Sequence, residues 1–198
     1  MNRSLHLSAL AVVLTLAACK PHPEQPQATP PAAKPAPAQP APAAAPATAS
    51  PAAGLADVGA QPTLRLPTVD GKTFDLAEQR GHWVVVNYWA TWCGPCLEEM
   101  PDLSALAALR EYIKVVGVAN DDIAPAQLQA FLQKHPVVYP IVQVDPGSPP
   151  ADFGAPPTLP ISWLIDPQGK VVKRFMRPVK AADIEAAIAA AGGPATAG

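Results

Sequence analysis

Two cysteines lie two residues apart in the segment YWATWCGPCLEEMP, residues 88–101. Cys93 and Cys96 could form a structural disulfide, half of a metal site, or a couple that cycles between dithiol and disulfide. A structural zinc site needs four Cys or His ligands, and His82 and His135 show no ligand spacing to each other or to the pair. A structural disulfide across so short a loop stabilises a fold little. We therefore favour the redox couple and expect no metal.

The two cysteines follow a buried strand and open a helix. Residues 83–88, WVVVNY, are an apolar run rich in β-branched side chains, typical of a strand buried on both faces. Residues 96–112 carry apolar side chains at helical spacing. Cys93 precedes the first turn, where unpaired N–H groups and partial positive charge stabilise a thiolate. We expect its pKa to lie below the roughly 8.5 of a free thiol.

The two thiols should have different roles. Cys93 should be exposed and should attack a partner disulfide as the thiolate. Cys96, one turn into the helix, should be shielded and should resolve the mixed disulfide. Between them, Gly94 allows a close approach of the backbone, and Pro95 presets the helical φ angle.

The rest of the chain predicts an α/β domain with a mixed central sheet flanked by helices. Residues 63–66 and 73–76 flank a turn at Asp70 and Gly71 and indicate an N-terminal β-hairpin. We expect further strands at residues 113–119, 139–144, 161–165 and 171–175, and further helices at 125–135 and 181–191. Strands and helices alternate first, and a hairpin and a helix follow.

The N-terminal part of the chain differs from the rest in composition. Residues 1–18 combine Arg3, a short apolar run and small residues before Cys19, and so resemble a bacterial lipoprotein signal peptide. The resemblance implies cleavage before Cys19 and lipidation of that residue; an ordinary secretory signal is the alternative. Residues 19–55 hold many of the 27 prolines of the chain, which favours an extended tether. The folded domain is expected over 56–198.

The strand, the WCGPC motif, a proline inside the following helix and the later Leu159-Pro160 pair resemble a thioredoxin fold. The TlpA/ResA-like group of exported thiol–disulfide oxidoreductases is the closer resemblance, and it covers residues 61–191. It implies that Pro160 is cis and faces the disulfide, that Leu159 offers backbone hydrogen bonds to a substrate, and that Trp92 forms an apolar lip. The substrate-binding residues expected from it are Trp92, Gly94, Pro95, Leu159 and Pro160.

One departure from thioredoxin concerns proton transfer. Thioredoxin has a buried Asp on the strand before the motif, whereas this chain has Asn87, which cannot titrate. The TlpA/ResA group places a Glu three residues after the second Cys, which is Glu99 here. Because residues i and i+3 are neighbours on a helix, Glu99 should lie near Cys96 and shuttle a proton during resolution. A solvated surface carboxylate is the alternative.

A second departure concerns residues 148–157, SPPADFGAPP. Relatives often have a short helix before the cis-proline, but this segment is too rich in proline for one. Substrate selection can differ at this edge.

These features predict an exported enzyme that reduces disulfides in periplasmic proteins, with cytochrome c maturation as one candidate setting. The Gly-Pro pair inside the motif is that of reducing thioredoxin, which favours reduction. A membrane thiol donor is then needed, because exported compartments are oxidising. We expect no cofactor. We also expect no nucleic-acid partner, since the formal net charge of −2 gives no excess of positive charge.

We expect a monomer in the bacterial periplasm, anchored to a membrane through lipid on Cys19. Lys20 follows that cysteine and favours the outer membrane over the inner one. Two other functions stay open. One is a thiol peroxidase of the peroxiredoxin type, although its signature is not found. The other is a tethered binding module without enzymatic activity.

Overall fold

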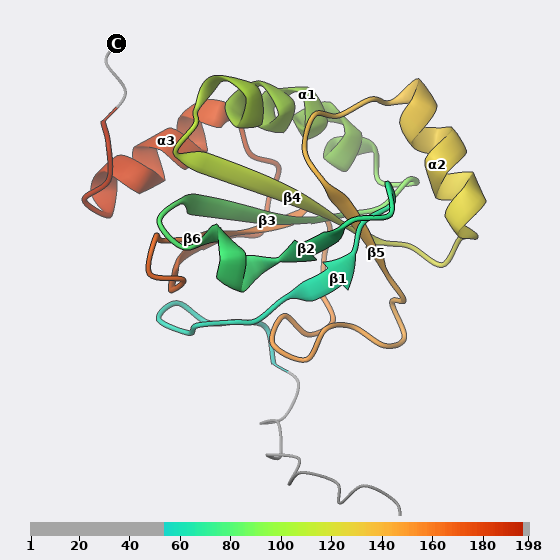
Figure 1. Ribbon diagram of the computed structural model, residues 1–198, viewed down its shortest axis with the longest axis horizontal. Helices are drawn as coiled ribbons and strands as arrows, with labels where there is room; N and C mark the ends of the chain where they lie inside the picture. Colours follow the sequence, from blue (N-terminus) through green and yellow to red (C-terminus); the bar gives the residue numbers. More distant parts are fainter. Residues whose placement is uncertain (1–53, 196–198) are drawn as a thin grey trace, which may run out of the picture. The chain divides into compact units, whose positions relative to one another are not determined.

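The computed structural model describes residues 54–195. The expected signal peptide (1–18), Cys19 and nearly all of the expected tether (19–55) lie outside these residues. The described part contains a five-stranded sheet, a separate two-stranded hairpin and three α-helices (Figure 1). Within it, none of the helices has the length and apolar character that crossing a membrane requires.

The elements follow the order expected from the sequence. The hairpin is formed by β1 (Arg65–Pro67) and β2 (Thr73–Asp75), and a short 3-10 helix, η1 (Leu76–Gln79), follows it. The sheet strands are β3 (Trp83–Trp89), β4 (Ile113–Asn120), β5 (Ile141–Val144), β6 (Ile161–Ile165) and β7 (Val171–Phe175). The helices are α1 (Gly94–Leu109), α2 (Pro125–Lys134) and α3 (Ala181–Ala190). Residues 148–157 form no helix, as their prolines predict.

The central sheet is mixed and has the strand order β5-β4-β3-β6-β7. β3, β4 and β5 are parallel, and α1 and α2 make the crossovers between them. β6 runs antiparallel to β3 and to β7, so the last two strands form the expected hairpin. The middle position of β3 explains why each of its residues is buried.

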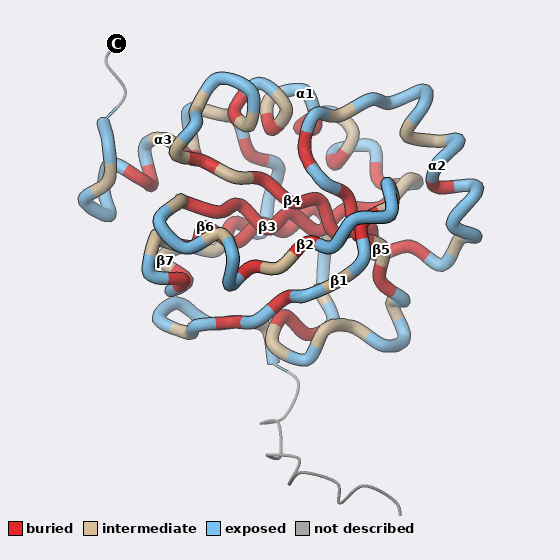
Figure 2. Tube along the Cα trace, in the orientation of Figure 1, coloured by how far each residue is buried: buried red, intermediate tan, exposed pale blue. Residues whose placement is uncertain are grey.

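The two faces of the sheet bury different elements. One apolar cluster joins Trp83, Val85 and Trp89 of β3 to side chains of all three helices. The other cluster joins Val84, Val86 and Tyr88 to the hairpin and to the loop before β6. The alternation of these six residues is the period of two of a β-strand. Figure 1 shows the helices on one side of the sheet and the hairpin on the other, and Figure 2 shows that the buried residues follow the strands.

Candidate active site

The two cysteines are joined by a disulfide at the start of α1, with their Cα atoms 5.3 Å apart. Cys93 is the N-cap residue with extended backbone, and its carbonyl oxygen accepts hydrogen bonds from the N–H groups of Cys96 and Leu97. Pro95 occupies the first turn, where its missing N–H costs no hydrogen bond. The helix therefore begins at the motif itself, slightly earlier than the sequence pattern predicts.

The expectation that Cys93 is exposed is wrong for this disulfide state. Cys93 is 5% exposed and Cys96 is fully buried. Both cysteines belong to the apolar cluster beneath α1. The residues around them are accessible instead: Gly94 and Pro95 are exposed, and Trp92 is 71% exposed.

The Leu159–Pro160 peptide bond is cis, as the resemblance implies. Pro160 directly precedes β6, whose first residue, Ile161, pairs with Tyr88 near the end of β3. Since β3 leads into the cysteine motif, Pro160 lies at the same end of the sheet as the disulfide. Pro160 is buried and Leu159 is half-buried.

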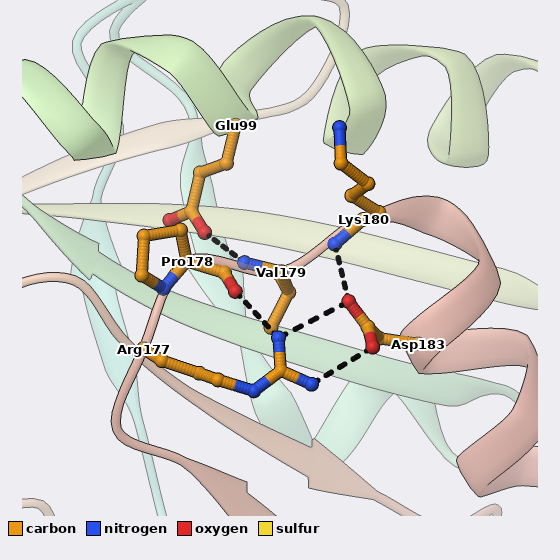
Figure 3. A network of polar contacts seen from close by, with 6 residues as sticks. All are labelled: Glu99, Arg177, Pro178, Val179, Lys180 and Asp183. Atoms are coloured by element: carbon orange, nitrogen blue, oxygen red, sulfur yellow. Dashed lines mark hydrogen bonds and ion pairs between the residues drawn. The ribbon is translucent and has the colours of Figure 1, made fainter.

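Glu99 is a buried carboxylate and not a solvated one, since its residue is only 2% exposed. Its Oε1 accepts a 2.7 Å hydrogen bond from Asn87 Nδ2. Its Oε2 accepts a 2.7 Å hydrogen bond from the Val179 backbone N–H (Figure 3). Asn87 Nδ2 also donates to Ser162 Oγ at 3.0 Å. Glu99, one turn after Cys96 on α1, thus joins a buried polar network with Asn87 on β3 and Ser162 on β6.

Burial raises the pKa of Glu99 from 4.5 to about 7, against the lowering effect of the hydrogen bonds from Val179 and Asn87. Asp102 on the same helix raises it further through like-charge repulsion. A carboxyl that titrates near neutrality can take up and release a proton at physiological pH. Glu99, one helical turn after Cys96, is therefore suited to general acid–base chemistry.

No three His, Cys, Asp or Glu side chains gather at a site for a metal ion anywhere in residues 54–195.

A model of the AhpC/TSA family matches residues 59–174, which is more than half of the chain. The chain belongs to the AhpC/TSA family. The chain is similar to ResA of Bacillus cereus, named a thiol-disulfide oxidoreductase, with 30% identity over 116 residues, 58% of this chain and 66% of that protein. ResA of Bacillus subtilis (strain 168) is 32% identical over 116 residues, 57% of this chain and 63% of that protein. The chain thus spans slightly less than two thirds of the length of these relatives.

Among solved structures, the chain is similar to one from Chlorobium tepidum that is provisionally named thiol:disulfide interchange protein DsbE. The two are 31% identical, the likeness covers 71% of this chain and all of that chain, and the TM-score is 0.60. These comparisons confirm the thioredoxin-like fold and the resemblance to ResA-like thiol–disulfide oxidoreductases, an enzyme class with a CxxC pair.

Sequence reasoning located the two cysteines but missed two groups of the polar network around Glu99: Ser162, which accepts from Asn87, and the Val179 N–H, which donates to Glu99. Ser162 interrupts the apolar strand β6, and a polar residue in such a strand is a signal that could have marked it. The N–H of Val179 left no signal, because any residue except proline supplies a backbone donor. Only the fold brings a loop 80 residues later in the chain against Glu99.

Proposed function

We propose that this AhpC/TSA-family chain is an exported thiol–disulfide oxidoreductase that reduces disulfides in other exported proteins. The observation that carries the proposal is the Cys93–Cys96 disulfide at the N-terminus of α1, with the buried Glu99 one turn further along the helix. A helix N-terminus stabilises the thiolate that opens disulfide exchange.

The reaction starts from the reduced protein. The Cys93 thiolate attacks one sulfur of the substrate disulfide, and the other substrate sulfur leaves and takes up a proton. The Cys96 thiolate then attacks Cys93 Sγ, which breaks the mixed disulfide and releases the second substrate sulfur as a thiol. Two protein thiols become one disulfide while one substrate disulfide becomes two thiols. An external dithiol donor, a membrane thiol protein, returns the pair to the reduced form by the same exchange.

Glu99 takes the proton of the Cys96 thiol during resolution. It lies three residues after Cys96 on α1, both residues are buried, and its pKa of about 7 makes it a base at neutral pH. The hydrogen bonds from Asn87 and Val179 stabilise the carboxylate before the transfer.

Substrates dock on the exposed rim of the disulfide. Trp92 supplies an apolar surface at one side of the motif, where Gly94 and Pro95 leave the backbone accessible. Leu159, held by the cis bond to Pro160, pairs with the extended backbone of the substrate on the other side.

Location and partners complete the proposal. Residues 1–18 direct export, Cys19 carries lipid, and the Pro/Ala-rich segment over 19–55 lets a monomeric domain reach partners in the periplasm. Lys20 favours the outer membrane. Apocytochrome c is a candidate substrate. Mass spectrometry of the mature N-terminus and membrane fractionation of a Cys19→Ser variant, expected to be released from the membrane, test the anchor.

Trapping tests the reaction. In a Cys96→Ala variant the mixed disulfide cannot be resolved, so exported proteins with cysteines should stay bonded to Cys93 and be released by a reductant. The matched control is the double variant Cys93→Ser/Cys96→Ala, which should trap none. Full reductase activity in a Cys93→Ser variant would falsify the proposal. Consumption of peroxide at a rate above that of disulfide reduction would favour the thiol peroxidase instead.

A further inference from the structure

The loop that joins β7 to α3 covers Glu99. Its backbone forms neither strand nor helix over residues 176–180. The Val179 side chain is buried in the core beneath α1, and the Val179 N–H donates to Glu99 Oε2 at 2.7 Å. One of the two hydrogen bonds to the carboxylate therefore depends on the conformation of a short connecting loop.

An ion pair fixes this loop from the solvent side (Figure 3). Arg177 Nη2 lies 2.8 Å from Asp183 Oδ1, and Arg177 Nη1 donates to the carbonyl oxygen of Pro178 at 2.8 Å. Asp183 Oδ2 also accepts a 2.9 Å hydrogen bond from the Lys180 N–H at the start of α3. Asp183, in the first turn of α3, therefore contacts residues before and after Val179, namely Arg177 and Lys180.

We propose that Arg177 and Asp183 are positioning residues, whose ion pair keeps the Val179 N–H directed at Glu99 and so sets the pH at which Glu99 gains or loses its proton. The pair touches neither the disulfide nor Glu99 in any hydrogen bond, so it acts through the loop. An effect of the ion pair on catalysis rests on the proposed function, in which Glu99 transfers a proton. An effect of the ion pair on the protonation of Glu99 does not depend on that function.

The charges of the site support this route. The pKa of Asp183 is held below its ordinary value, first by the hydrogen bond from Arg177 and then by the Lys180 N–H, so Asp183 stays ionised at neutral pH. The titratable and charged groups near Glu99 are Glu98 and Asp102 on α1, Arg177 and Lys180 in the loop, Asp183 on α3 and Tyr139 before β5. Cys96 lies one turn earlier on α1, Asn87 on β3 donates to Glu99, and Ser162 on β6 accepts from Asn87.

A hollow of about 210 Å³ between α1 and the loop is lined by Glu99, Arg177, Val179 and Asp183. If the ion pair is broken, Arg177 and Pro178 lose the contacts that fix them, and the Val179 N–H can turn away from the carboxylate. Loss of a hydrogen bond that stabilises the ionised form raises the pKa of a carboxyl that stays buried.

Two variants separate this positioning from a simple effect of charge. Removing a positive charge raises the pKa of a nearby carboxyl, and removing a negative charge lowers it. Acting by charge alone, Arg177→Gln and Asp183→Asn would shift the pKa of Glu99 in opposite directions. Acting through the loop, both should raise it, by about half a unit or more. The NMR signal of the Glu99 side-chain carboxyl carbon, followed across pH in the oxidised protein, measures the shift without any enzymatic reaction.

Two further variants serve as controls. Arg177→Lys keeps a cation that can reach Asp183 and should shift the pKa less than Arg177→Gln. Glu185→Gln breaks another ion pair of α3, with Arg110 at 2.7 Å, and should leave the pKa of Glu99 unchanged. Opposite shifts in the two test variants, no shift in either, or a fall in both as water reaches the carboxylate would each overturn the inference.

The consequence for the reaction is measured separately. The pH profile of mixed-disulfide resolution should move to higher pH in Arg177→Gln and Asp183→Asn by the same amount as the pKa of Glu99. If the pKa moves and the profile does not, the inference about positioning holds and the proposed role of Glu99 in proton transfer fails.

Discussion

Asn87 Nδ2 donates a 2.7 Å hydrogen bond to Glu99 Oε1 between two residues that are both buried. Asn87 stands on the central strand β3, and Glu99 reaches it from α1. The amide can stabilise a carboxylate without titrating itself. Of the two buried partners, only Glu99 gains or loses a proton near neutral pH.

Glu99→Gln should change how stability depends on pH. The pKa of Glu99 is raised from 4.5 to about 7 in the folded protein. Such a carboxyl contributes stability that is fully present below pH 4.5 and is lost as the pH rises through 7. At about pH 8 the variant should gain about 3 kcal/mol of unfolding free energy relative to the wild type, with no gain near pH 4. Urea denaturation of the oxidised protein at several pH values measures this, and a difference independent of pH would contradict it.

Asn87→Leu should destabilise the protein at high pH, where Glu99→Gln stabilises it. It removes the donor to Glu99 Oε1, so the pKa of Glu99 should rise above 7. The free energy of unfolding should fall by about 1–3 kcal/mol at pH values above that pKa, and by less below it. Ser162→Ala is the matched control, because it removes only the acceptor of the second Asn87 bond. Equal losses at high and low pH would show that the loss comes from packing instead.

Gly117→Ala should destabilise the core beneath the active-site helix. Gly117 pairs with Asn87 across β3 and β4, and an added Cβ would lie 2.5 Å from Ile141 Cδ1 and 3.0 Å from Trp89 Nε1. Overpacking of this kind costs about 1–3 kcal/mol. Gly94→Ala is the control for stability, since its Cβ meets no heavy atom within 4 Å. Thermal unfolding of both oxidised variants compares them; a stable Gly117→Ala protein would mean that Ile141 moves aside without cost.

Trp92→Ala should weaken substrate binding without unfolding the protein. The side chain is 71% exposed, so its loss should change the unfolding free energy by less than about 0.5 kcal/mol. Loss of an exposed aromatic anchor should raise KM for a disulfide-bonded protein substrate about tenfold while kcat changes little. Val138→Ala removes an apolar side chain of similar exposure and should leave KM unchanged. Equal KM values in the two variants would exclude Trp92 from the docking surface.

Much of the fold followed from patterns in the sequence. The β-branched and aromatic residues of β3, the helical spacing of apolar residues in α1 and the turn before β7 each reflect local backbone preferences. The ends of elements followed less well. The sequence pattern starts β5 at residue 139, but the strand begins at Ile141. Pro140 precedes it and has no N–H to offer the sheet.

The chemistry of the site was also determined by the sequence. Two cysteines at this spacing, between a buried strand and a helix and without further metal ligands, point to disulfide exchange, because the helix N-terminus acts on the thiol locally. Glu99 was placed on the correct face of α1 by the i, i+3 rule.

Only the tertiary structure decided what covers these residues. Helical spacing fixes the direction of the Glu99 side chain, but its pKa of about 7 reflects burial, which raises it, against the hydrogen bonds from Asn87 and from Val179, 80 residues later in the chain, which lower it. The burial of Cys93 likewise depends on the core that surrounds both cysteines. Desolvation is a property of all the neighbours together, and neighbours distant in the chain leave no local signal in the sequence.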